Sequence, residues 1–462
     1  MRGADLNNRM TDGPIAPQIV RFAVPLFIGN LFQQLYNTAD ALIVGNLIGN
    51  DALAAVSATG TLVFLLISLF AGMAAGAGVV VARYYGARDA DKVQRAIHTV
   101  LAFDLTVGVL LTLLGTTLTP TLLRWMGTPA DVMERSVLYI RVFFSGSLGL
   151  VLYNSCRGIM QALGDSTHPL YYLIFSSLLN VALDVLFIAV FHMDVDGAAL
   201  ATILSQFVSA VLCLRRLMHG GEETRVSLRK IRYDRGIIGL IVRYGLPSGL
   251  QNSLNALANV IVQSNINAFG TMAVAGNGAY AKIEGFVFLP IVAFSIALTT
   301  FIGQNLGAKE YERARTGARF GVWSAIVLAE LIGALVWWTA PGLVGAFTKE
   351  PEAIAYGVMK ARTCAWFFCL LAASNVLAAV LRGAGKAVIP MISMISFWCV
   401  VRVAILSIAV PIWQSIAVVN WVFPITWAMS TVFLFVYFLR ADWLHSFERE
   451  KTDGGNRLWR SL

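Results

Sequence analysis

The chain has few charged residues and few cysteines for its length. Lys, Arg, Asp and Glu make up 13% of its 462 residues, about half the share that is usual in soluble domains. The five cysteines lie in or at the ends of apolar segments with no metal-ligand spacing, so we interpret them as packing residues. The sequence lacks a GxxxxGK[ST] phosphate loop, which argues against direct use of ATP. We expect no cleavable signal peptide, because the polar segment 1–17 leads directly into an apolar run.

The chain contains many long apolar runs with few charged residues. Hydrophobic residues make up 57% of the chain, and the runs are near the ~20 residues that a helix needs to cross the hydrocarbon core of a bilayer. The pattern predicts an all-α membrane protein with twelve transmembrane helices. The expected spans are 21–44, 53–81, 96–119, 136–157, 170–191, 198–218, 238–268, 273–303, 318–339, 357–381, 389–411 and 415–439.

The two halves of the sequence repeat each other at an offset of about 221 residues. Gly164 recurs as Gly385, and Pro169 recurs as Pro390. Each copy holds six spans, so we predict two six-helix lobes of equal orientation, related by a pseudo-two-fold axis along the membrane normal. The predicted division is an N-terminal lobe at 1–218, a cytoplasmic linker at 219–237, a C-terminal lobe at 238–440 and a cytoplasmic tail at 441–462.

Basic residues crowd every second loop. The segments 83–95, 215–243, 309–319 and 440–460 are rich in Lys and Arg, whereas the connections between them have few cations or none. By the positive-inside rule, both termini and the 219–237 linker are predicted to be cytoplasmic in a multi-pass protein of the cell membrane. The net charge of +9 therefore reflects topology, and we expect no nucleic-acid partner.

Polar residues within the first-lobe spans carry the functional signal. Asp40 follows Gln33, Tyr36 and Asn37 on one helical face, and Asn180 stands one turn before Asp184. A carboxylate at membrane depth is costly and normally faces the bundle interior with a partner. We therefore expect these side chains to converge with Asn154 and with the polar stripe Thr202, Ser205, Gln206 and Ser209.

The oxygen atoms of such a cluster suit either of two ions. Carboxylate, amide and hydroxyl oxygens can hold Na⁺, and two buried carboxyl groups can instead share protons. The sequence does not choose between them. The repeat supplies a comparison, because Asp184 corresponds to Ile405 and Thr202 to Phe423, so the acidic set exists in one lobe only. Residues present in one copy are the better candidates for ion coupling, although Asp40 and Asp184 can also serve only to hold helices together.

The second lobe has charges of its own within predicted spans. We expect Lys282, Glu284, Glu330 and Arg402 to be buried, and Glu284 with Arg402 can form an interhelical pair of structural or substrate-binding role. Pro25 interrupts the hydrogen bonding of the first span, so a bend is predicted there.

Three segments resemble one transporter family. The run QLYNTAD at 34–40, the run RGIMQALGDSTHP at 157–169 with its second copy LRGAG at 381–385, and the run GQNLGAK at 303–309 resemble motifs of the multidrug and toxic compound extrusion (MATE) family. They occur in the right order over nearly the whole chain. The resemblance is greatest to the DinF-like branch of the family.

The resemblance implies a secondary active antiporter. Such a protein exports amphipathic, cationic small molecules in exchange for Na⁺ or H⁺ by alternating access, needs no organic cofactor and is not an enzyme. By resemblance to the cation-responsive site of this branch, the residues with implied coupling roles are Asp40, Asn154, Asn180, Asp184 and Thr202. A Na⁺ ion could be bound by four of them, Asp40, Asn180, Asp184 and Thr202. As substrate-cavity candidates we predict Gln33, Tyr36, Asn37, Gln206, Glu284 and Arg402, with Pro25 as hinge; we expect a monomer in the bilayer.

Two other functions stay open at this point. A lipid-linked precursor flippase of the same superfamily would also have two helical lobes, but we expect it to show a strongly cationic cavity for pyrophosphate. A polytopic membrane enzyme would need a clustered catalytic set, such as a His-rich metal motif, and the sequence shows none.

Overall fold

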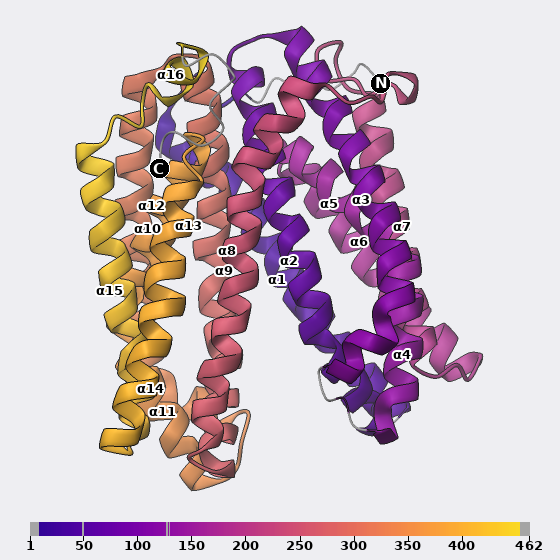
Figure 1. Cartoon of the computed structure of the whole chain (residues 1–462), viewed down its shortest axis with the longest axis vertical. Helices are drawn as coiled ribbons and strands as arrows, with labels where there is room; N and C mark the ends of the chain where they lie inside the picture. Colours follow the sequence, from indigo (N-terminus) through magenta and orange to yellow (C-terminus); the bar gives the residue numbers. More distant parts are fainter. Residues whose placement is uncertain (1–8, 49, 126–127, 129, 453–462) are drawn as a thin grey trace. The chain divides into compact units, whose positions relative to one another are not determined.

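The described part of the protein is helical throughout its regular structure. The computed structural model describes residues 9–48, 50–125, 128 and 130–452, without the side chains of 41–42, 45–46, 50–66, 130–131 and 450–452. Every regular element in these ranges is a helix (Figure 1), which confirms the predicted all-α class. The outer ends of the predicted first lobe, 1–8, and of the predicted tail, 453–462, lie outside the described residues.

Contacts divide the chain into two compact units. Unit 1 comprises Met1–Arg9 and Val24–Leu246, and unit 2 comprises Met10–Ala23 and Pro247–Leu462. Helices α1 (Ile15–Leu47) and α8 (Arg235–Asn267) each have residues in both units. In each helix the division falls beside a proline, Pro25 or Pro247. The boundaries between the compact units thus lie inside helices α1 and α8. The predicted lobe boundaries instead follow the repeat in the sequence.

Unit 1 is a bundle in which α3 and α5 pack against each other and α7 packs against α4, α5 and α6. An apolar cluster that includes Val107, Leu111, Ile140 and Phe144 fills the space between α3, α4 and α5. The elements lying wholly in unit 1 are α2 (Asn50–Gly86), α3 (Ala90–Trp125), α4 (Ala130–Ser145), α5 (Ser147–Ala162), α6 (Thr167–Asp184), the π-helix η1 (Val185–Val190), α7 (Val195–Met218) and the short 3₁₀ helix η2 (Leu228–Lys230).

Unit 2 repeats this arrangement. Helix α9 packs against α10, α11 and α12, just as α2 packs against α3, α4 and α5 in unit 1. Left-handed backbone recurs at the same offset, at Gly164 and Gly385 and at Arg88 and Lys309. The elements of unit 2 are α9 (Thr271–Gly307), α10 (Tyr311–Gly345), α11 (Pro351–Ala365), α12 (Phe368–Gly383), α13 (Val388–Met394), the π-helix η3 (Ile395–Val401), α14 (Arg402–Trp413), α15 (Ile416–Arg440) and α16 (Ser446–Thr452).

Two spans predicted as single helices are broken. The span 136–157 becomes α4 and α5, bent by 50°, and the span 357–381 becomes α11 and α12, bent by 57°. At the first break, a Cβ on Gly146 would lie 2.1 Å from the side chain of Ile203, so only glycine permits this approach. At the second, Glu330 Oε1 accepts the N–H of Cys369 at 3.2 Å. The half-buried acid therefore satisfies a backbone donor that the break exposes.

The apolar helices are numerous, but their count differs from the prediction. In the described part, nine helices are long and apolar enough to span a membrane, or eleven if each bent pair is one span. The predicted span 238–268 falls in α8, which is 33 residues long yet is not among them. Its many Asn and Gln side chains lower its hydropathy. Twelve spans, and the symmetry axis, stay predictions.

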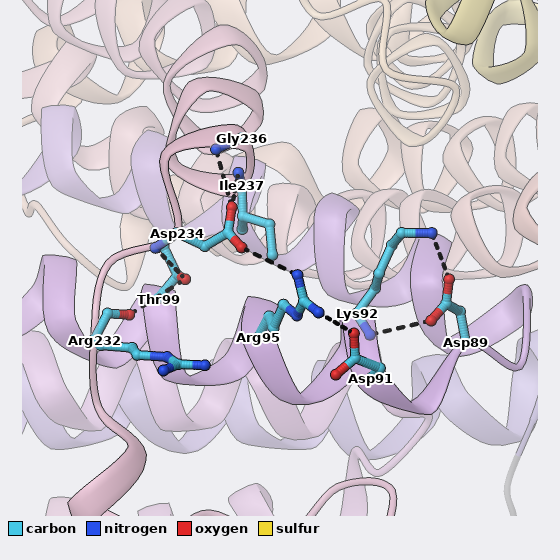
Figure 2. Close-up of polar contacts among 9 residues, drawn as sticks. All are labelled: Asp89, Asp91, Lys92, Arg95, Thr99, Arg232, Asp234, Gly236 and Ile237. Carbon is cyan, nitrogen blue, oxygen red and sulfur yellow. Dashed lines mark hydrogen bonds and ion pairs between the residues drawn. The ribbon is translucent and has the colours of Figure 1, made fainter.

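The linker before α8 is fastened to α3 (Figure 2). Thr99 Oγ1 accepts the N–H of Asp234 at 3.2 Å, and Arg95 lies 3.8 Å from the Asp234 carboxylate. The same carboxylate accepts the N–H groups of Gly236 and Ile237 at 2.9 and 3.2 Å. Asp234 is therefore the N-cap of α8, which explains why this helix begins at Arg235.

A close helix contact in unit 2 gives a stability test. A Cβ on Gly276 would lie 2.3 Å from the carbonyl oxygen of Ala353, whereas a Cβ on Gly278 meets nothing within 4 Å. We expect Gly276→Ala to destabilise the protein by about 1–3 kcal/mol, because α9 and α11 must move apart. Gly278→Ala should be neutral or slightly stabilising. Thermal unfolding of the two purified variants in the same detergent checks this, and equal melting temperatures would contradict it.

Candidate functional site

The structure brings four of the predicted coupling residues of unit 1 together. Thr202 on α7 lies between two partners, because its Oγ1 is 3.5 Å from the hydroxyl of Tyr36 on α1 and accepts the Asn180 amide at 3.5 Å. Asp184 lies one turn after Asn180 on α6, and both side chains are 0% exposed. Asp184 and Asp40 are neighbours whose charges interact directly. Three helices thus converge on one polar cluster, named here the acidic cluster.

Four oxygen atoms of the acidic cluster lack donors in the described part of the chain. Within the described residues, one oxygen of Asp40, both oxygens of Asp184 and the Asn180 carbonyl are buried with no hydrogen-bond partner. A buried acceptor without a donor is costly unless something binds it. Unpaired carboxylate and amide oxygens match the hard ligands that Na⁺ requires, and the adjacent carboxyl groups equally allow a proton to be shared. The residues therefore fit either coupling ion.

A polyvalent metal centre is not evident in the part of the chain that the structure describes. No group of three or more His, Cys, Asp or Glu side chains is arranged there to hold a metal. A cation in the acidic cluster would instead be held by two carboxylates, an amide and a hydroxyl. These are hard oxygen ligands, which Na⁺ accepts, and the adjacent carboxyl groups can equally share a proton.

The local backbone explains how the acidic cluster is closed at one end. The π-helix η1 begins at the residue after Asp184, and π-type turns are frequent at functional sites because they change the direction of side chains. Beyond it, Ile188 packs with Val44, Val195 and Ala198 in an apolar cluster that Tyr139 also contacts. These side chains keep water away from that end of the acidic cluster.

Asn154 lies in a different setting. Its amide donates to the Leu150 carbonyl of its own helix at 2.9 Å. With Asp104 and Ser155 it lines a small cavity of about 30 Å³ between α2, α3 and α5, large enough for one water molecule by volume. No hydrogen bond joins Asn154 to the acidic cluster in the described residues. Its coupling role, which the resemblance implies, stays a prediction.

The predicted cavity residues of α1 and α7 differ in their hydrogen-bond partners. Gln33 donates its amide to Asn37 Oδ1 at 3.4 Å, one turn along α1. Tyr36 faces Thr202, and on α7 the Gln206 carbonyl is buried without a partner in the described part of the chain. The polar stripe of α1 therefore leads from Gln33 towards the acidic cluster.

The unit 2 charges are arranged differently from the prediction. Lys282 is exposed, so its predicted burial is wrong, and Glu284 and Glu330 are only half-buried. Glu284 forms no ion pair with Arg402 within the described residues; its carboxylate accepts the Tyr280 hydroxyl at 3.4 Å. Arg402 instead donates to Thr426 Oγ1 at 3.0 Å.

Sequence reasoning missed Lys360. This residue of α11 is 5% exposed and hydrogen-bonds to Asn277 of α9. Its ammonium lies 4.5 Å from the ring centroid of Phe423, and the Arg402 guanidinium lies at the same distance from the same ring. The signal was available, because Lys360 is a basic residue inside the predicted span 357–381.

Comparisons with known proteins follow the repeat. The MatE family matches residues 25–186 and again residues 247–408. Probable multidrug resistance protein YoeA of Bacillus subtilis is 29% identical over 90% of this chain and 92% of its own length. The FAD transporter of Shewanella oneidensis is 24% identical over 75% and 77%.

A solved structure agrees with the fold as a whole. The crystal structure of a MATE in the bent conformation superimposes with a TM-score of 0.86 at 27% identity, covering 96% of this chain and 98% of that one. The DinF-like branch stays a prediction. Because one family matches both repeats and together these matches cover most of the sequence, the chain belongs to the MatE family, the multidrug and toxic compound extrusion transporters that its motifs resemble.

Proposed function

We propose that the protein is a secondary active antiporter that exports amphipathic, cationic small molecules in exchange for Na⁺ or H⁺. The observation that supports the coupling is the acidic cluster, where Asp40 and Asp184 interact at close range and their oxygens lack donors. Family membership and the names of relatives support drug export. An enzymatic role has no support from these observations, and we propose that the protein needs no organic cofactor and works as a monomer.

Charge neutralisation is the proposed driving step. With both carboxylates ionised, Asp40 and Asp184 repel each other and hold α1 and α6 under electrostatic stress. A Na⁺ ion or a proton removes this repulsion and lets α1 approach α6 and α7. Exchange requires that this approach lowers the affinity for cargo, so that ion and cargo bind in turn. In this proposal, ion binding and cargo binding both act on the conformation of α1.

Pro25 gives α1 its means of bending. The helix runs from Ile15 to Leu47 with Pro25 inside it, and proline cannot donate a hydrogen bond to the carbonyl of Arg21. A bend there therefore breaks fewer backbone bonds than elsewhere. That a related MATE has been solved in a bent conformation supports a hinge here.

Neutral variants of the two acids test the coupling. Asp40→Asn and Asp184→Asn keep the side-chain shape but remove charge and titration. Each should reduce gradient-driven ethidium efflux from proteoliposomes by about tenfold or more, within the usual range of coupling free energies. Ethidium binding should also lose its dependence on Na⁺ or pH. Asp91→Asn, at an exposed position that pairs with Arg95, is the control; near-parental uphill transport by both site variants would refute the acidic cluster as coupling site.

The hinge makes a separate prediction. Pro25→Ala restores a helical hydrogen bond, so thermal stability should stay the same or rise while efflux falls severalfold. The matched control is Pro120→Ala, which removes a proline from the interior of α3 and should leave efflux unchanged. If Pro25→Ala transports as the parental protein does, the bend of α1 is not part of the cycle.

Membrane orientation is tested with reporters. We propose that both termini and the linker are cytoplasmic. Fusions after Arg235 and after Arg440 should then report a cytoplasmic location, and one within Asp194–Asp196 an extracytoplasmic one. A fusion after Arg235 that reports an external location would require an odd number of spans before it and would overturn the topology.

A further inference from the structure

Unit 2 contains two buried cations that share one aromatic ring. Lys360 and Arg402 are 5% and 3% exposed. They come from α11 and α14, yet each lies 4.5 Å from the centroid of Phe423 on α15. Cations so placed gain from the ring quadrupole but remain positively charged. We name Lys360, Arg402 and Phe423, with the residues that contact them, the basic cluster.

The basic cluster is short of negative charge. Among the described residues, Glu284 is the acid that interacts electrostatically with both cations, and it forms no ion pair with either. Lys360 and Arg402 use neutral acceptors, Asn277 and Thr426, and the Arg402 Nε–H is buried without a partner. With Lys360 protonated, two cations against one carboxylate leave a net positive charge that the hydrocarbon cannot compensate.

The repeat shows that this charge occupies a special place. Lys360 stands where unit 1 has Tyr139, and Phe423 stands where it has Thr202, each at the common offset of 221 residues. Both unit 1 counterparts belong to the surroundings of Asp40 and Asp184. Corresponding regions of the two units thus carry acids in one copy and cations in the other, although the charged residues themselves stand at different positions of the repeat. A structural pair of charges would not need this inversion.

We propose that the basic cluster is a binding site for an anionic group, a carboxylate, sulfonate or phosphate, carried by an aromatic or amphipathic molecule. The guanidinium of Arg402 offers its free Nε–H to an oxyanion, and Lys360 adds a second positive charge. Trp398, whose ring centroid lies 5.6 Å from the Arg402 guanidinium, is only partly buried and offers flat apolar surface beside it.

The site extends the range of cargo. It rests on the proposed export function only in assigning the bound anion to a transported molecule, because binding itself needs no ion gradient. An acidic cluster for the coupling cation and a basic cluster for an anionic group allow zwitterionic or anionic cargo as well as cations. A relative whose name is FAD transporter acts on a phosphate-bearing aromatic molecule, which is the chemistry inferred here.

Two probes that differ in charge alone test the proposal. The purified full chain in nanodiscs of zwitterionic lipid is titrated with 2-naphthoate and, separately, with the neutral isostere 2-naphthamide, after subtraction of binding to empty nanodiscs. The parental protein should bind the naphthoate about tenfold more tightly, as expected for one charge-assisted contact. If Lys360 is uncharged, Arg402 and Glu284 balance each other; the two probes then bind equally, and the proposal is overturned.

Variants locate the effect. Arg402→Gln should bring the affinity ratio of the two probes close to one, and Arg402→Lys should largely preserve it. Lys282→Gln, which removes an exposed cation from α9, is the matched control and should leave the ratio at its parental value. An unchanged ratio in Arg402→Gln places the anion elsewhere and also overturns the proposal. If Arg402→Gln does not fold, Lys360→Met takes its place and should also bring the affinity ratio of the two probes close to one. A ratio of one in the parental protein overturns the proposal without any variant.

The outcomes separate this proposal from the proposed function. Loss of naphthoate preference with intact ethidium efflux would sink the anion site and leave the antiporter standing. Naphthoate preference in a protein that performs no gradient-driven efflux would do the reverse. Both measurements use the same preparation, so a difference between them reflects the protein.

Discussion

A charge inside the membrane-spanning part of this protein has to be compensated by other protein groups or by a bound ion, because hydrocarbon offers neither water nor counter-ions. In unit 1 the constraint falls on Asp40 and Asp184, two interacting acids of which three carboxyl oxygens lack hydrogen-bond donors in the described residues. Unit 2 meets it with Lys360 and Arg402, stacked on Phe423. We propose that a bound cation or proton completes the first arrangement and an anionic group the second. Under these two proposals, binding a counter-charge changes the energy of each cluster far more than it would change that of a neutral core.

The same constraint governs the backbone, and it explains where the helices break. A peptide N–H exposed by a break needs an acceptor from the protein, and Glu330 provides one for Cys369 at the start of α12. Proline lowers the cost of bending because its missing N–H has no bond to lose, which applies to Pro25 in α1 and Pro247 in α8. The chain divides into its two compact units beside these prolines.

Much of the acidic cluster was visible in the sequence, and the reason is periodicity. Asn180 and Asp184 are four residues apart and hence share a helical face. An acid in an apolar membrane span normally faces the interior of the helix bundle. Unit 2 was harder to predict. Lys282 lies within an apolar run yet is exposed, and the expected pair of Glu284 with Arg402 does not form. Lys360 was overlooked although its signal was of the same kind, because no acidic partner one turn away drew attention to it.

The sequence by itself determined the all-α class, the internal repeat, the family and the identity of the polar residues within the spans. Hydropathy, helical period and repeat offset can be read along the chain without knowledge of how its helices pack. Only the tertiary structure decided which helices meet. Thr202 touches Tyr36 from 166 residues away, and Lys360 meets Arg402 over the ring of Phe423. Such contacts depend on how helix faces pack and where helices bend. A change in the rotation of one helix would leave the sequence pattern intact and separate the charges.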